Sequence, residues 1–182
     1  DLALFDTQGT HSVVTMQILS PVTGTQTIDL LVGGQTTFEG QQAIESIQTN
    51  TSTFGGNTTT SEFRSYGRRT GDAEFTTYGS ISISRTAVGP LTATTTGKEV
   101  LSPPFVDRQY SLSLGGTFTA PRSSSTTTTV SLTGTPDRVT TATDSRTITT
   151  KFVARESVTV PAGTYDTCRL DVTTTTAGNG SG

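Results

Sequence analysis

One histidine, His11, and one cysteine, Cys168, offer the broadest side-chain chemistry in the sequence. A serine or cysteine hydrolase needs a histidine or another base beside its nucleophile, and His11 lies near the N-terminus in an expected strand. We therefore interpret His11 as an exposed or edge-strand residue. A single histidine rules out a histidine-rich metal site, and a single cysteine rules out an intramolecular disulfide and a cysteine-based zinc site.

Cys168 lies in the segment DTCRLDV, where strand alternation places it on one face with Leu170 and Val172. The favoured interpretation is a buried cysteine that behaves as a small hydrophobic residue. The alternative is a thiol that reacts with a cysteine of another protein.

Paired carboxylates can catalyse hydrolysis without a histidine. The candidate acidic residues lie singly at expected turns or on strand faces, so solvated surface charge is the favoured interpretation. They are Asp72, Glu74, Asp107, Asp144, Glu156, Asp166 and Asp171. The sequence lacks the spaced oxygen ligands of a calcium-binding loop and the Gly-rich loops that bind phosphate. We therefore predict no enzyme activity, no cofactor and no metal site.

Charged residues make up 15% of the 182-residue chain, and the formal net charge is -3. Without a basic cluster, the sequence argues against nucleic-acid binding and against polybasic attachment to membranes. No apolar run approaches the roughly 20 residues that span a bilayer, so no membrane-spanning segment is expected. Few lysines and many Thr, Ser and Gly residues favour a bacterial protein of the periplasm or cell surface, or a secreted one.

Apolar and polar residues alternate with period two along most of the chain, and threonine, the most frequent residue, favours strands. Residues 11–20 and 25–32 are expected to form a first hairpin. Residues 33–34 are expected to turn the chain again, and residues 49–60 to form a loop. Only residues 38–48 are compatible with a helix as well as with a bent strand.

The second half of the chain alternates in the same way. Gly79 predicts a bulge or a bend within a strand. Residues 108–120 are expected to form a strand, and the Ser/Thr tract 123–129 an edge strand or long hairpin rather than a linker. The sequence therefore predicts an all-β fold, a strongly curved antiparallel sheet in the form of a half-barrel or open barrel, with at most one short helix.

The stretch ESVTVPAGTYDTCRLDV, residues 156–172, resembles a hairpin signature of uncharacterised bacterial periplasmic and lipoprotein-type β proteins. In those proteins a strand V-x-V-P-A-G-T-(F/Y) turns at Pro-Ala-Gly and returns through a strand that carries Cys and Arg. Proline can end a strand because it has no main-chain N–H that would need a partner there. Glycine can adopt backbone angles that other residues avoid, as a turn requires. The signature residues are Val158, Val160, Pro161, Gly163, Tyr165, Cys168 and Arg169.

This resemblance implies a curved sheet similar to the half-barrel of the lipoprotein carriers LolA and LolB, whose concave face can hold an acyl chain. Those proteins continue into a further strand with Trp and a Gly-x-Gly turn, whereas residues 173–182 read TTTTAGNGSG and the chain has no Trp. We therefore expect a single β domain, residues 1–182, that is truncated or edge-exposed at its C-terminal end.

The leading hypothesis is a non-enzymatic periplasmic or cell-surface module whose concave sheet holds a hydrophobic small molecule, a lipid or a partner segment. The alternative function is a structural or adhesive surface domain that assembles by strand pairing. The candidate lining residues equally suit an ordinary core. They are Phe75, Tyr78, Ile81, Ile83, Tyr110, Leu112, Leu114 and Phe118.

Overall fold

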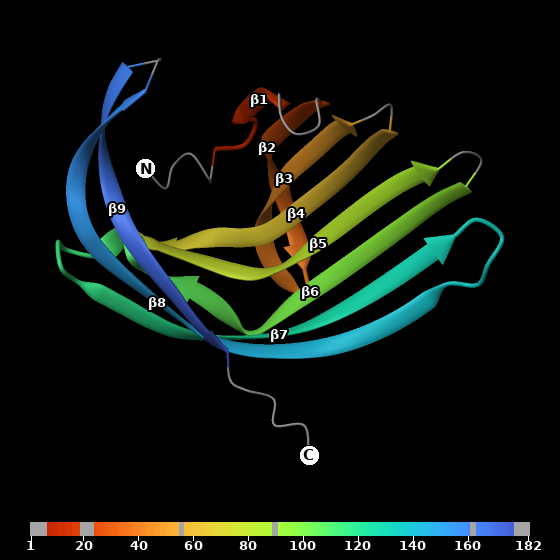
Figure 1. Cartoon of the computed structure of the whole chain (residues 1–182). Coiled ribbons are helices and arrows are strands. Elements are labelled where there is room, and N and C mark those ends of the chain that lie inside the picture. Colours follow the sequence, from red (N-terminus) through yellow and green to blue (C-terminus); the bar gives the residue numbers. More distant parts are fainter. Residues whose placement is uncertain (1–6, 19–23, 55–56, 89–90, 161–162, 177–182) are drawn as a thin grey trace.

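The computed structural model describes residues 7–18, 24–54, 57–88, 91–160 and 163–176. They form one sheet of nine antiparallel strands whose order in the sheet is their order in the chain (Figure 1). Among the described residues the only helix is a short 3-10 helix, and no helix is long and apolar enough to cross a membrane. The elements are β1 (His11–Ile18), β2 (Gly24–Phe38), β3 (Gln41–Phe54), β4 (Asn57–Gly71), β5 (Glu74–Val88), β6 (Leu91–Asp107), η1 (Gln109–Ser111), β7 (Thr117–Leu132), β8 (Arg138–Val160) and β9 (Gly163–Thr176).

Threonine suits this sheet for two reasons. Its branched Cβ fits the pleated backbone of a strand better than the crowded surface of a helix. Its hydroxyl also bonds across strands, as between Thr119 and Thr149 at 3.1 Å and between Thr127 and Thr141 at 3.4 Å. Both pairs are directly opposite in the register of β7 and β8, where such contacts stabilise a sheet most effectively.

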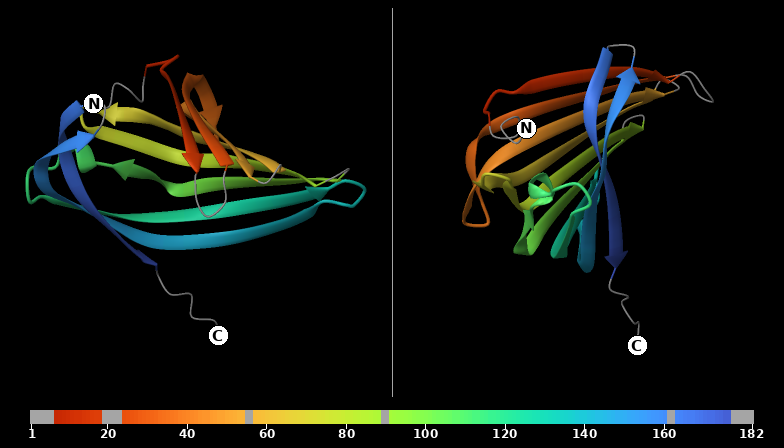
Figure 2. Two further views of the ribbon diagram at one scale, coloured as in Figure 1. Left: turned by 45° about the horizontal axis from the view of Figure 1, so that its top comes forward. Right: turned by 90° about the vertical axis from the view of Figure 1, so that its left-hand side faces the viewer.

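The sheet is open. In the described chain β1 and β9 form its two edges, and each of them pairs with a single neighbouring strand. Figures 1 and 2 show that the long strands β7 and β8 are bowed and that the sheet as a whole is twisted. The prediction of an all-β, antiparallel sheet is confirmed.

Alternation along the strands divides the side chains into two faces. The first, which we call the Phe38 face, carries a buried cluster of Phe38, Ala43, Tyr66 and Tyr78. The rings of Phe38 and Tyr66 stack with their centroids 4.4 Å apart, and this contact joins β2 to β4. The second, which we call the Arg122 face, carries Arg122 of β7 and the residues that share its side of the sheet.

Gly79 leaves the space in which Phe38 packs against the sheet. The register between β5 and β6 shifts between Thr77 and Gly79, so the bulge predicted at Gly79 is confirmed. A Cβ atom at Gly79 would overlap the carbonyl oxygen of Glu99 and would lie 2.6 Å from Cε1 of Phe38. The absence of a side chain at this position is therefore a packing requirement.

The sequence was compatible with either a helix or a bent strand over residues 38–48. These residues form a hairpin turn followed by a strand. Glu39 and Gly40 make the turn with positive φ angles of 49° and 76°, as a type I′ turn requires. The turn predicted at residues 33–34 is wrong, because they form a bulge inside β2. The loop predicted over residues 49–60 is also wrong, because its described residues belong to β3 and β4.

The strand predicted over residues 108–120 is wrong in its first part, because η1 follows β6 and β7 begins only at Thr117. The carboxylate of Asp107 accepts a hydrogen bond from the main-chain N–H of Gln109 at 2.9 Å, and this local bond favours a turn over an extended strand. The tract 123–129 lies in a long hairpin, as one alternative predicted. It belongs to an inner strand, with β6 and β8 on either side.

Candidate binding surface

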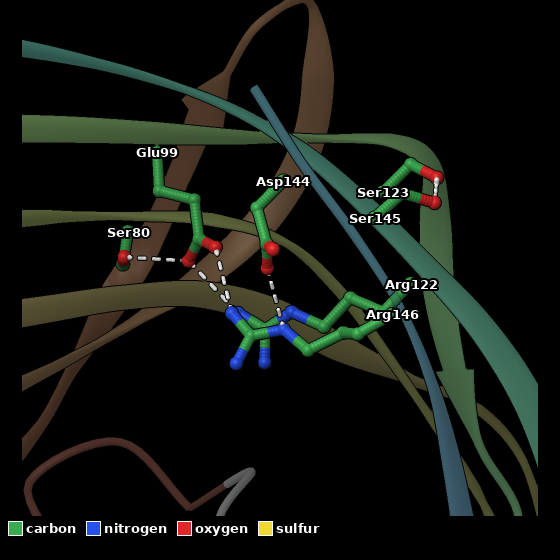
Figure 3. A network of polar contacts seen from close by, with 7 residues as sticks. All are labelled: Ser80, Glu99, Arg122, Ser123, Asp144, Ser145 and Arg146. Atoms are coloured by element: carbon green, nitrogen blue, oxygen red, sulfur yellow. Dashed lines mark hydrogen bonds and ion pairs between the residues drawn. The ribbon is translucent and has the colours of Figure 1, made fainter. Parts of the chain in front are cut away.

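A network of charged and hydroxyl side chains crosses the Arg122 face from β5 to β8 (Figure 3). Oε2 of Glu99 accepts hydrogen bonds from Nη2 of Arg122 at 2.8 Å and from the hydroxyl of Ser80 at 3.3 Å. Nη2 of Arg146 lies 4.0 Å from Oε1 of Glu99, and its Nε lies 2.9 Å from Oδ2 of Asp144. The Glu99 side chain is only 17% exposed, so these ion pairs are partly shielded from water.

Strand register brings the two arginines together. Arg122 of β7 is directly opposite Arg146 of β8, and Ser80 of β5 is directly opposite Glu99 of β6. Like charges in directly opposite positions destabilise a sheet unless other groups offset them. Glu99 and Asp144 supply that compensation, and Figure 3 shows the two guanidinium groups side by side beneath Glu99.

A pocket of about 230 Å³ opens on the same face between β3, β4, β5 and η1. The aromatic rings of Phe75 and Tyr110 provide much of its apolar surface, together with Ile44. Gly67 makes room for one ring, because a Cβ there would lie 2.6 Å from Cε1 of Phe75. The lining residues are Ile44, Ser46, Ser65, Gly67, Phe75, Asp107 and Tyr110.

Asp107 is the carboxylate of this pocket. Burial raises the pKa of its carboxyl group, and the hydrogen bond from the main chain of Gln109 lowers that pKa by a smaller amount. Its second oxygen accepts from Nε2 of Gln109 at 2.8 Å. Asp107 is therefore a fixed polar group at the end of a largely apolar cavity.

The pocket and the charged network meet at one pair of serines. Ser65 lines the pocket, and Ser80 donates to Glu99 in the network. These two serines are directly opposite in the register of β4 and β5, which places their Cβ atoms about 5 Å apart. The Arg122 face therefore presents an apolar pocket and a guanidinium pair on one continuous surface.

The Phe38 face carries a second ionic cluster. Oε1 of Glu45 accepts from Nη1 of Arg64 at 3.1 Å and from the hydroxyl of Tyr66 at 3.0 Å. The hydrogen bond with Glu62 raises the pKa of Arg64, and burial raises the pKa of Tyr66. These groups are partnered with one another, so the cluster joins β3 to β4 and serves as a structural support for the core.

The structure brings two of the candidate lining residues, Phe75 and Tyr110, together in the pocket. Tyr78 instead belongs to the buried cluster of the Phe38 face, and Ile81 packs against that cluster. Ile83 lies on the same side of β5 as Ile81, since the two are separated by one residue.

The remaining candidates lie in or after the segment that follows η1. Leu112 caps η1, and Leu114 lies in the turn before β7 with 66% of its surface exposed. Phe118 lies on β7 on the same side as Arg122, four positions earlier in an unbroken strand. The eight residues are therefore distributed over both faces and one loop.

The signature segment forms the β8–β9 hairpin at the C-terminal edge of the sheet. Val158 is opposite Tyr165 and Val160 is opposite Gly163. Pro161 lies outside the described residues. The hairpin is a structural element, and the side chains of Val158 and Tyr165 are exposed.

Cys168 is exposed, so its interpretation as a buried hydrophobic residue is wrong. The reason is its place on β9, which is an edge strand of the sheet and is exposed along most of its described length. Beside it, Nη1 of Arg169 lies 3.4 Å from Oε2 of Glu156 in an exposed ion pair. A shallow cavity of about 310 Å³ next to the thiol has polar walls that include Arg155 and Asp166.

Another cavity, of about 430 Å³, lies near the β2–β3 turn. Its walls include the exposed side chains of Gln35, Gln42 and Arg68. Because water competes for every polar group in such walls, a ligand would gain less binding free energy in this cavity than in the half-buried pocket beside Asp107.

Sequence reasoning missed Glu99, Arg122 and Arg146, and it interpreted Asp144 as a solvated surface charge. No local motif joins these residues, because they come from three different strands. Alternation along each strand determines which face each of these residues lies on relative to its own strand. It shows that they share one face of the sheet only after the register between the strands is known.

In comparisons with known proteins, no family model matches the chain, and no curated protein or solved structure matches it either. Within the described residues no group of three or more His, Cys, Asp or Glu side chains could hold a metal ion. His11 lies exposed on β1, and its Nε2 is 3.0 Å from Oδ1 of Asp29. The Arg122 face is therefore the surface on which a functional proposal is best founded.

Proposed function

We propose that the protein is a non-enzymatic binding module that holds a hydrophobic ligand on the Arg122 face of its open sheet. The observation that carries this proposal is the half-buried pocket formed by Ile44, Phe75 and Tyr110. Ligand sites are concave and mostly apolar, with a few fixed polar groups, and Asp107 provides such a group here. We also propose the periplasm or the cell surface as the compartment, on the basis of composition.

Binding of the uncharged fluorophore N-phenyl-1-naphthylamine tests this proposal, since its emission rises in an apolar site. Ser65→Phe would place a ring in the pocket and should abolish the increase. Ser61→Phe, on the same face of β4 but outside the pocket lining, should leave it unchanged. Circular dichroism would confirm that both variants fold. No binding by the wild type, or equal binding by both variants, would contradict the proposal.

A second candidate function is assembly through strand pairing. The observation that favours it is the open edge at β9, whose described residues are exposed along most of their length. Exposed edges recruit further strands through the main chain. Val172 of β9 and Val139 of β8 are 59% and 60% exposed, which provides a matched pair of sites.

Sedimentation of the protein over a range of concentrations tests this second candidate. If β9 pairs with another copy, the wild type should form a defined oligomer that Val172→Lys weakens and Val139→Lys leaves intact. A monomer at every concentration would exclude self-assembly through this edge.

A further inference from the structure

The guanidinium pair on the Arg122 face has more hydrogen-bonding capacity than its protein partners use. Arg122 and Arg146 are directly opposite, and their side chains are 26% and 34% exposed. Among the described residues, one hydrogen bond joins these two guanidinium groups to a carboxylate. In it, Nη2 of Arg122 donates to Oε2 of Glu99.

The Nε atoms of both arginines are buried and have no hydrogen-bond partner within the described chain. Nε of Arg146 lies 2.9 Å from Asp144 as an ion pair, without the geometry of a hydrogen bond. Leaving buried donors unpaired is costly, more so for charged groups. Nε of Arg146 still faces the carboxylate of Asp144, so the buried nitrogen that lacks an acceptor among the described residues is Nε of Arg122.

The position of the pair indicates where that acceptor belongs. Figure 3 shows one terminal nitrogen of each guanidinium group directed away from Glu99 and Asp144, on the inner side of the bend of the strands. Guanidinium groups bind carboxylates and phosphates through parallel N–H donors. The apolar pocket begins at Ser65, opposite Ser80 of the network.

We propose that Arg122 and Arg146 bind the anionic headgroup of an amphipathic ligand whose apolar chain extends into the pocket of Phe75 and Tyr110. This inference rests on the proposed function and specifies the class of ligand. Glu99 holds the two guanidinium groups in place and, as a neighbouring negative charge, limits the affinity for the anion. The same headgroup chemistry is available in a fatty acid and in an alkyl phosphate.

Displacement of N-phenyl-1-naphthylamine by dodecanoate, dodecyl phosphate and 1-dodecanol tests the proposal, with acetate as a headgroup without a chain. Dodecanoate or dodecyl phosphate should displace the fluorophore at a concentration about tenfold lower than 1-dodecanol does, since a charge-assisted hydrogen bond contributes at least that factor. The preferred anion identifies the headgroup. Equal displacement by 1-dodecanol and both anions would overturn this inference while leaving the hydrophobic site standing.

Three variants separate a specific headgroup contact from a general loss of folding. Arg122→Gln should lower the affinity for the anionic amphiphile about tenfold and leave the affinity for 1-dodecanol unchanged. Glu99→Gln should increase the affinity for the anionic amphiphile severalfold, a result that a damaged fold cannot produce. Arg85→Gln, an exposed site on the other face of β5, is the matched control and should have no effect.

Other outcomes lead to distinct conclusions. If Arg122→Gln and Arg85→Gln bind the anion equally, ordered water satisfies the buried donors and the inference is overturned. If the wild type binds neither the fluorophore nor any amphiphile, the proposed function fails as well.

Discussion

Replacing Gly79 with alanine should destabilise the protein strongly. The added Cβ would overlap the carbonyl oxygen of Glu99, which belongs to the neighbouring strand, and would lie 2.6 Å from Cε1 of Phe38. The Phe38 ring can shift, but the carbonyl cannot move without disturbing the pairing of β5 with β6. Overpacking of this kind costs about 1–3 kcal/mol, and occasionally more.

Gly97 provides a matched control on the adjacent strand. A Cβ there would meet only the hydroxyl oxygen of Ser82, at 2.7 Å, and that small side chain can rotate away. Replacing a strand glycine with alanine without a clash stabilises by about 0.5–1 kcal/mol, because the unfolded chain loses freedom. The two substitutions should therefore differ by about 1.5–4 kcal/mol in free energy of unfolding.

Urea denaturation followed by circular dichroism measures this difference. With a slope of about 1–3 kcal/mol per molar urea, the two midpoints should differ by about 0.5 M or more. Adding Phe38→Leu to Gly79→Ala should restore only part of the loss, because the carbonyl of Glu99 remains. If Gly79→Ala costs no more than Gly97→Ala, the described packing of Phe38 over Gly79 is wrong.

Three further predictions concern other parts of the sheet. Burial raises the pKa of Asp107, so the folded protein binds this proton more tightly than the unfolded chain does. Protonated Asp107 therefore favours folding at low pH. This contribution to stability is lost as the pH rises through the folded-state pKa. Urea titrations should therefore show the stability of Asp107→Asn relative to the wild type increasing from acidic to neutral pH, and a constant difference would refute the assigned shift. Thr127→Val removes one exposed hydroxyl contact and should change the free energy of unfolding by less than about 0.5 kcal/mol, with a larger loss showing that the threonine pairs are major stabilising contacts. Cys168 should react with a disulfide reagent such as DTNB in the folded protein, whereas reaction only after unfolding would show that the thiol is covered.

The fold class followed from the sequence because threonine content and period-two alternation both favour strands throughout the chain. The bulge at Gly79 was also predictable, since glycine in an apolar strand indicates a bulge or a close approach. The turn at Glu39 and Gly40 was missed in favour of residues 33–34. A pair of glycines is a stronger local turn signal, but here it permits a bulge inside β2.

The binding surface was much less predictable. Phe75 and Tyr110 were named, but the segment around Tyr110 was expected to be a strand, and the local hydrogen bonds of Asp107 favour η1 instead. Arg122 and Arg146 come together only through the register of β7 and β8. A shift of one residue in that register would place one of them on the opposite face, and alternation alone does not fix it.

The strict succession of strands affects how the protein is made. Each strand pairs with the strand synthesised immediately before it, so no segment must wait for a distant, later part of the chain. Loop closure between neighbours is the least costly step in building a sheet. These strands can therefore form progressively during translation, with each completed hairpin serving as the template for the next, and β9 presents an open edge of the same kind to a further strand.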